Sequence, residues 1–234
     1  MIALAGYALL EEKIQYCFQE KKLLEEALRH SSYLNEGGAP GLKSNERLEF
    51  LGDSVLGLTA ADFLFRRYPG LPEGRLTRMR AALVCEGSLA LAARELHLGS
   101  FLQFGRGEEK IGGRERDSIL ADAMEALFAA VYLDGGFSQA EVLVRRMILD
   151  HERERLQKFY DYKTALQEYV QQDRKNRLEY ELLGEQGPEH EKVFLSAVRL
   201  NGREIGRGEG RSKKESQQFA AQDAWKNLGV EEEF

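Results

Sequence analysis

The spacing of apolar residues changes part-way along the chain. Up to about residue 152, apolar residues recur three and four positions apart, which is the pattern of amphipathic helices. Helices are predicted over residues 7–19, 22–31, 45–67, 75–96, 118–133 and 137–157. From residue 161 on, the pattern predicts a helix over 161–172, strands over 177–184, 192–200 and 203–208, and a last helix that ends at Gly229.

Turn and capping residues mark the second region. Asn201-Gly202 predicts a tight hairpin between two strands, and Ser212-Lys-Lys-Glu215 has the form of a helix capping box. The predicted fold class is an all-α domain followed by a small α+β domain of order α-β-β-β-α. We place the domains at residues 1–152 and 161–230, joined by a charged linker at 153–160.

The helix predicted over 45–67 carries an acidic stripe. At about 100° per residue, one side of this helix presents three acids, Glu46, Glu49 and Asp53. The opposite side presents a core stripe made of Leu48, Leu51, Val55 and Leu58. Such a stripe is usually a solvated face. However, Gly52 costs about 1 kcal/mol in mid-helix, which indicates a close approach to another segment. Phe50 lies beside the acids and suggests a partner surface. We therefore expect a site that holds a cation.

The helix predicted over 118–133 is apolar on nearly every side, which is typical of a buried helix. Ser118 and Gly135-Gly136 are its predicted ends, and its acids, Asp122 and Glu125, share one face. Buried carboxylates must be paired, protonated or bound to metal. An arginine from elsewhere could satisfy them. Oxygen ligands alone suit Mg²⁺ or Mn²⁺.

Composition narrows the setting. The chain has 234 residues, of which 43% are hydrophobic, so it can bury a core in one or two domains. The apolar run at residues 2–10 is too short to span a bilayer and lacks the basic start of a signal peptide. We expect a cytoplasmic protein with no membrane partner. Two unpatterned cysteines and four scattered histidines predict neither disulfides nor a zinc site.

The net charge of −6 does not point to nucleic acid, so any such binding must come from local clusters. One cluster consists of Arg199, Arg203, Arg207, Arg211, Lys213 and Lys214, with only Glu204 and Glu209 among them. The strands carry no stacking aromatics, which favours recognition of a duplex by shape. Residues 105–117 are rich in glycine and charge but lack the lysine and serine of a phosphate-binding loop, and we expect a mobile surface loop there.

Three stretches resemble known motifs. Asn45-Glu-Arg-Leu-Glu-Phe-Leu-Gly-Asp-Ser54 resembles the signature of the ribonuclease III family, and Ser118-Ile-Leu-Ala-Asp-Ala-Met-Glu-Ala-Leu127 resembles its second acidic motif. Residues from Asp161 to Lys214 resemble a double-stranded-RNA-binding domain. The resemblance covers nearly the whole chain, in the domain order of the bacterial enzyme. Minor departures lie at Arg29, Ser31, Ser216 and Phe219.

The resemblance implies a role for each matching residue. The metal-binding carboxylates would be Glu49, Asp53, Asp122 and Glu125, with catalytic roles for Asp53 and Glu125 and for Glu46 and Glu73, which line the same cleft. Phe50 would insert into the partner subunit of a homodimer. The RNA-binding residues would be Thr164, Gln167, Glu168, Gln171, His190, Arg211, Ser212, Lys213 and Lys214.

The implied reaction is the hydrolysis of phosphodiester bonds in double-stranded RNA. Mg²⁺, or Mn²⁺ as a substitute, would be the cofactor, at two metal positions roughly 4 Å apart. Products would carry 5′-phosphate and 3′-hydroxyl ends with short 3′ overhangs, and ribosomal and messenger RNA precursors would be the substrates. The alternative is a catalytically silent regulator that binds double-stranded RNA. Such a relative is expected to lose metal ligands, and all six acids are present here. In a second alternative the acids form a structural ion-pair network, with neither Mg²⁺ dependence nor RNA affinity.

Overall fold

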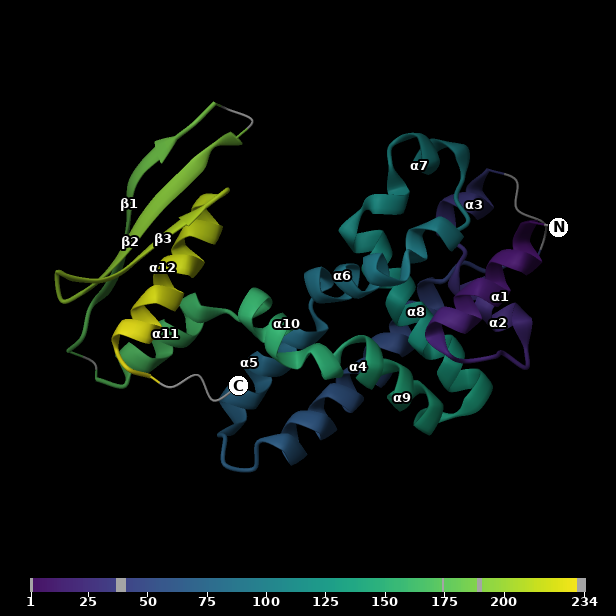
Figure 1. The fold of residues 1–234 in the computed structure, drawn as a ribbon, viewed down its shortest axis with the longest axis horizontal. Helices are drawn as coiled ribbons and strands as arrows, with labels where there is room; N and C mark the ends of the chain where they lie inside the picture. The colour runs from purple at the N-terminus through teal and green to yellow at the C-terminus, as the bar shows by residue number, and fades with distance from the viewer. Residues whose placement is uncertain (1, 37–40, 174, 189–190, 231–234) are drawn as a thin grey trace. The chain divides into compact units, whose positions relative to one another are not determined.

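The structure is a computed structural model that describes all residues except 1, 37–40, 174, 189–190 and 231–234 (Figure 1). The chain divides into two compact units, Met1–Tyr160 and Asp161–Phe234. The first unit is helical, and the second holds three antiparallel strands between helices. The predicted fold class is confirmed.

The helices of the first unit follow the predicted order with additional breaks. Its α-helices are α1 (Ile2–Ile14), α2 (Lys21–Ala27), α3 (Ser31–Asn35), α4 (Glu46–Arg67), α5 (Glu73–Val84), α6 (Glu86–Leu96), α7 (Arg106–Lys110), α8 (Asp117–Gly135), α9 (Phe137–Met147) and α10 (Glu152–Phe159). The described part of this unit also contains the 3₁₀ turns η1 (Leu98–Phe101), η2 (Gly113–Glu115) and η3 (Leu149–His151). The helix predicted over 75–96 is two helices, because Cys85 has extended backbone angles (φ −70°, ψ 157°).

Helix α8 forms the centre of the first unit, where it packs against α2, α4, α6 and α9 (Figure 1). All apolar side chains from Ile119 to Val131 are buried, as expected of a helix that is apolar on nearly every side. The helix ends before Gly136, whose φ of +82° suits glycine. Although α8 is the most thoroughly buried element, no helix within the described residues is both long and apolar enough to cross a membrane.

The buried side of α4 is rotated from its predicted position. Its buried residues are Leu48, Gly52, Val55, Leu56, Thr59, Ala60 and Leu64. The prediction that Leu58 belongs to the core was wrong, since its side chain is 59% exposed. The burial of Gly52 and Leu56 moves the packed face toward the acidic stripe. The acids of α4 therefore border the contact with α8 instead of lying opposite the core.

The segment predicted as a mobile loop, 105–117, contains α7 and η2 and is fixed by hydrogen bonds. The Glu36 carboxylate accepts from the backbone N–H groups of Arg106 (2.7 Å) and Gly107 (2.8 Å), and these bonds lower its pKa. The Arg114 guanidinium donates to the carbonyls of Gly99 (2.7 Å) and Leu102 (3.0 Å). The segment lies at the surface, but backbone and side-chain contacts hold its shape.

The segment expected as a linker, 153–160, is mostly the helix α10, which packs against α5 and α6. Arg155 is 1% exposed and donates to the carbonyls of Ser88 (2.6 Å) and Met147 (3.0 Å). It also pairs with the Glu95 carboxylate at 3.2 Å. A buried arginine needs such partners because its charge cannot be left unpaired. These contacts place α10 within the first unit.

The second unit contains α11 (Tyr162–Gln171), β1 (Leu178–Gln186), β2 (Val193–Leu200), β3 (Arg203–Gly210) and α12 (Lys213–Asn227). The sheet order is β1-β2-β3, and α12 packs along β2 and β3 (Figure 1). Asn201 and Gly202 both have positive φ, as a tight hairpin requires, which confirms the predicted turn. The Ser212 hydroxyl accepts from the Glu215 N–H at 3.1 Å, so the predicted cap also forms.

Candidate active site and RNA-binding surface

Helices α4 and α8 touch through their backbones at Gly52. A Cβ atom at Gly52 would lie 1.8 Å from the carbonyl oxygen of Glu125. Only glycine allows this approach, and it explains a residue that weakens a helix interior by about 1 kcal/mol. The expected close approach at Gly52 is confirmed. It brings the acids of α4, one turn before and one residue after Gly52, beside those of α8.

Three carboxylates meet at this crossing. Glu49, Asp122 and Glu125 each place an oxygen atom within 4.8 Å of the other two, and all three side chains are half-buried. Asp53 is exposed and lies near enough for its charge to act on Glu125. The structure therefore brings together the four acids that the resemblance assigned to metal binding, three as a tight group and Asp53 at its edge.

The electrostatics of this group are unbalanced. Burial, followed by repulsion from Asp53, Glu49 and Asp122, raises the pKa of Glu125 to about 8. The pKa of Glu49 is raised by burial and then by the charges of Asp122 and Glu46. Among the described residues, the charges that act on Glu49 and Glu125 are all negative, so no arginine in that part of the chain balances these two acids. A divalent cation would supply the missing positive charge, and oxygen-only ligands suit a hard cation.

The other two predicted acids lie outside the tight group. Glu46 begins α4, is exposed, and accepts from the Ser44 hydroxyl at 2.8 Å. Glu73 begins α5, is also exposed, and accepts from the Thr77 hydroxyl at 2.8 Å. Among the described residues, neither joins the three acids within 4.8 Å.

Sequence reasoning missed one acid near the group. Burial is the main cause of the raised pKa of Asp122, and the charge of Glu86 adds to it, while His30 acts in the opposite direction. Glu86 is the first residue of α6, which packs against α8. Its position was hidden because the sequence predicted one continuous helix through residue 86, and the break at Cys85 turns the start of α6 toward α8.

The outward side of α4 carries large exposed apolar side chains among its polar ones. Phe50 is 79% exposed and Phe65 is 72% exposed, and Leu58 lies between them along the helix. The unusual exposure of Phe50 that the helical angle predicted is therefore confirmed. Large exposed aromatic side chains next to polar groups mark surfaces that bind a partner.

In the second unit, the starts of α11 and α12 are tied together. The Gln218 side chain accepts from the Lys163 N–H at 3.1 Å and donates to the Asp161 carboxylate at 2.6 Å. Asp161 caps α11 by accepting from the Thr164 N–H at 3.1 Å. Burial opposes the charge on Asp161, but the hydrogen bonds from Gln218 and Thr164 outweigh it and lower the pKa. These bonds hold the start of α11, with Thr164, beside the first turns of α12.

The predicted RNA-binding residues in this region are all exposed. They are Thr164, Gln167, Glu168 and Gln171 on α11, and Arg211, Ser212, Lys213 and Lys214 at the start of α12. The four on α11 share one face, because they are spaced by three and four residues. His190, the remaining predicted contact, lies outside the described residues.

The basic cluster seen in the sequence is divided by the fold. Arg199 of β2 and Arg207 of β3 lie on the sheet face turned away from the helices, where both pair with glutamates. Only Arg211, Lys213 and Lys214 lie at the start of α12. The cluster in the sequence is therefore not one surface in the fold, because side chains alternate between the two faces of a sheet.

Comparisons with known proteins cover both units. The family described as "Ribonuclease-III-like" matches residues 20–152, and the "Double-stranded RNA binding motif" matches residues 162–228. The chain is 52% identical over 227 residues to a "Ribonuclease 3" from Caldanaerobacter subterraneus subsp. tengcongensis, covering 94% of this chain and 97% of the relative. A "Ribonuclease 3" from Listeria welshimeri is 47% identical over 221 residues, covering 94% and 96%.

A solved structure matches the helical unit. The nuclease domain of ribonuclease III from Campylobacter jejuni superimposes with a TM-score of 0.57 at 42% identity, covering 61% of this chain and 95% of that chain. The helical unit carries the acid group, and the second unit has the fold of a duplex-RNA-binding motif. With relatives that match along nearly the whole length, the chain belongs to the ribonuclease III family and is an endoribonuclease that acts on double-stranded RNA.

Proposed function

We propose that Glu49, Asp53, Asp122 and Glu125 bind Mg²⁺, with Mn²⁺ as a possible substitute. The observation that carries this proposal is the set of three carboxylates whose oxygen atoms lie within 4.8 Å of one another. The raised pKa of Glu125 supports it, because the group repels itself in the absence of a cation. A bound cation would lower that repulsion and hold all four acids in the ionised form.

The metal would supply Lewis acidity to the phosphodiester and activate a water molecule for its hydrolysis. Asp53 and Glu125 would hold this centre where the scissile phosphate binds, and Glu46 and Glu73 would position substrate at its edge. The products would carry 5′-phosphate and 3′-hydroxyl ends with short 3′ overhangs. Precursors of ribosomal and messenger RNA in the cytoplasm would be the substrates.

The second unit would hold the duplex. Thr164, Gln167, Glu168 and Gln171 would face a minor groove, and Lys213 and Lys214, with Arg211 and Ser212, would contact phosphates across the major groove. Their exposure and the bonds that join α11 to α12 support this assignment. Such a domain spans about 16 base pairs with little sequence preference. We place its boundaries at residues 161–230.

A homodimer would place two acid groups on one duplex. The exposure of Phe50, at 79%, supports a role for this side chain in the partner's surface. The related nuclease domain from Campylobacter jejuni has a region involved in dimer formation. Each acid group would then cut one strand, which accounts for a staggered cut.

The test is incubation of the purified protein with long duplex RNA in Mg²⁺, in Mn²⁺ and with chelator. We expect short duplex products with either metal and none with chelator, and the products should accept a 5′-phosphate label only after phosphatase treatment. Cleavage that persists in chelator would contradict a metal centre. Binding without cleavage in any divalent metal would support the silent RNA-binding regulator instead.

A further inference from the structure

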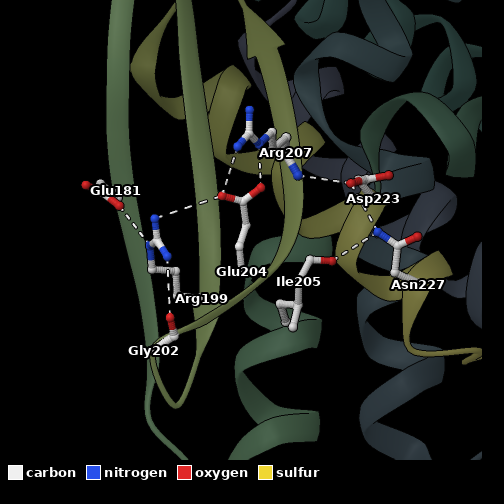
Figure 2. Close-up of polar contacts among 8 residues, drawn as sticks. All are labelled: Glu181, Arg199, Gly202, Glu204, Ile205, Arg207, Asp223 and Asn227. Atoms are coloured by element: carbon white, nitrogen blue, oxygen red, sulfur yellow. Dashed lines mark hydrogen bonds and ion pairs between the residues drawn. The ribbon is translucent and has the colours of Figure 1, made fainter.

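A ladder of alternating charges crosses the face of the sheet that is turned away from α11 and α12 (Figure 2). Arg199 on β2 donates to the Glu181 carboxylate on β1 at 2.8 Å. The Nη2 atom of Arg199 lies 3.9 Å from the carboxylate of Glu204 on β3. Glu204 also accepts from the Arg207 guanidinium, with one of the two contacts at 3.2 Å. The four side chains, hereafter the sheet ladder, thus join all three strands.

The ladder follows from the register of the strands. Arg199 lies opposite Glu204, and Arg207 lies opposite Ala197, two residues before Arg199. On the other side, Glu181 lies opposite the same Ala197. The small side chain of Ala197 leaves room for the long side chains around it to meet above the sheet. Cross-strand pairs of opposite charge stabilise a sheet.

The backbone beneath the ladder is also held. The Asp223 carboxylate accepts from the Arg207 N–H at 2.9 Å, and the Asn227 amide donates to the Ile205 carbonyl at 3.0 Å (Figure 2). Both side chains come from α12 and cover the outer edge of β3. Arg207 is therefore held at two points: its backbone N–H bonds to Asp223, and its guanidinium bonds to Glu204.

The two basic regions of this unit differ in the partners of their cations. In the sheet ladder both arginines are paired with carboxylates, and the pairing lowers the pKa of Glu204. At the start of α12, the carboxylate of Glu215 accepts from the backbone N–H of Arg211 at 2.6 Å, and Lys213 and Lys214 are exposed. Phosphate can reach the lysines directly, whereas at the ladder it must first displace a carboxylate.

We infer that Glu181 and Glu204 are specificity-determining residues that keep the arginines of the sheet face from binding nucleic acid. The inference rests on the proposed RNA-binding surface at the starts of α11 and α12, and it explains why a duplex would bind there and not at the sheet face. Glu179 and Glu209 are exposed on the same side. Glu179 pairs with Arg177 at 2.8 Å, and Glu209 adds a negative charge that repels phosphate.

The physical reason lies in the sequence-independent attraction of cations to phosphate. Each phosphate contact releases counterions and steepens the dependence of binding on salt, by about 0.7 per contact for single strands. Two free arginines on a flat sheet would accept any backbone, including single strands, because they read no duplex shape. Paired as they are, they leave recognition to the helices, whose spacing fits the grooves of a duplex.

The test uses the full chain with Glu181→Gln and Glu204→Gln combined, beside Glu209→Gln as a control for the loss of a single charge. Glu209 lies on the same strand and face as Arg207, so its substitution removes one charge without freeing an arginine. Binding of a short single-stranded RNA and of a duplex RNA is measured by fluorescence anisotropy at several salt concentrations. Thermal unfolding verifies that each variant is folded.

We expect the double variant to bind single-stranded RNA at least threefold more tightly than the wild type, with a salt slope steeper by about 1. The control should bind single-stranded RNA as tightly as the wild type does. Equal affinity of the double variant and the wild type for single-stranded RNA would overturn the inference. So would a control that gains at least half as much as the double variant on a logarithmic scale, because it removes half as many charges and charge alone would then explain the effect.

A second pair of variants separates this inference from the proposed RNA-binding surface. Arg199→Ala with Arg207→Ala should leave duplex binding within twofold of the wild type, whereas Lys213→Ala with Lys214→Ala should weaken it. A loss of duplex binding in the arginine variant would overturn the inference. If only the lysine variant fails to weaken binding, the proposed surface is wrong and the single-strand measurement still decides the role of the ladder.

Discussion

Replacing Gly52 by alanine tests the contact that assembles the active site. The new Cβ would lie 1.8 Å from the Glu125 carbonyl oxygen, whereas such contacts are essentially never shorter than 3.0 Å, so α4 and α8 must separate by about 1.2 Å. Overpacking of this kind costs about 1–3 kcal/mol, and the better helix propensity of alanine returns about 1 kcal/mol. The net loss of unfolding free energy should therefore be ~0–2 kcal/mol.

The effect on catalysis should be larger than the effect on stability. Moving α8 away from α4 separates Glu125 and Asp122 from Glu49, and a displacement of about 1 Å in an active site can cost 100-fold in rate. We expect cleavage of duplex RNA under single-turnover conditions to fall about 100-fold in Gly52→Ala. Duplex binding should stay within twofold, because the second unit is unchanged.

Gly57→Ala is the matched control. It lies on the same helix, and a Cβ there would meet no atom within 4 Å in the described chain. This variant should keep the cleavage rate and gain about 0.5–1 kcal/mol of stability. If Gly52→Ala cleaves within threefold of the wild type, or if Gly57→Ala loses as much activity, the crossing at Gly52 does not organise the acids.

Three further predictions concern separate parts of the chain. Because burial and the charges of neighbouring acids raise the pKa of Glu125 to about 8, the metal-free protein should lose stability as the pH rises from about 4.5 to about 8. Glu125→Gln should then be more stable than the wild type at about pH 9, by ~2 kcal/mol in denaturant unfolding with chelator. This difference in unfolding free energy is smaller than the full pKa shift of Glu125 would give, because several carboxylates share the repulsion. Equal stability of Glu125→Gln and the wild type at that pH would refute the prediction. Lys213→Ala with Lys214→Ala should weaken duplex binding and reduce its salt slope by about 2, and an unchanged slope would exclude phosphate contacts. Phe50→Glu should shift the protein toward monomer in sedimentation, and an unaltered profile would remove Phe50 from the interface.

The parts of the fold that the sequence predicted well have local causes. The burial of α8 follows from a run with almost no polar side chains, and the hairpin at Asn201-Gly202 follows from two residues that tolerate positive φ. The position of Gly52 at a helix crossing was also predictable, because a glycine in a helix interior needs a reason. In each case, residues within one element determine the outcome.

The parts that the sequence did not predict depend on contacts between distant segments. The break at Cys85 separates two helices that share one amphipathic pattern, and the continuation of the first unit through α10 depends on the buried Arg155. Leu58 is exposed because the packing of Gly52 against Glu125 sets the rotation of α4. Periodicity within one helix does not contain that information.

The candidate site shows the same division. Spacing alone placed Asp122 and Glu125 on one face of α8, and the family resemblance joined them with Glu49 and Asp53. The nearby position of Glu86 required the fold. The division of the basic cluster also required the fold. Arg199 and Arg207 are close to Lys213 in sequence, but they lie on the face of the sheet opposite to α12.

The most direct test of the acid group is single-turnover cleavage by Glu125→Gln at saturating RNA in Mg²⁺. Glu141→Gln is its control, since Glu141 lies in the same unit and pairs with Arg145. We predict that Glu125→Gln binds duplex RNA within twofold of the wild type and cleaves it at least about 1,000-fold more slowly. The control should cleave normally. Cleavage by Glu125→Gln within tenfold of the wild type would contradict the assignment of these carboxylates as the catalytic metal site.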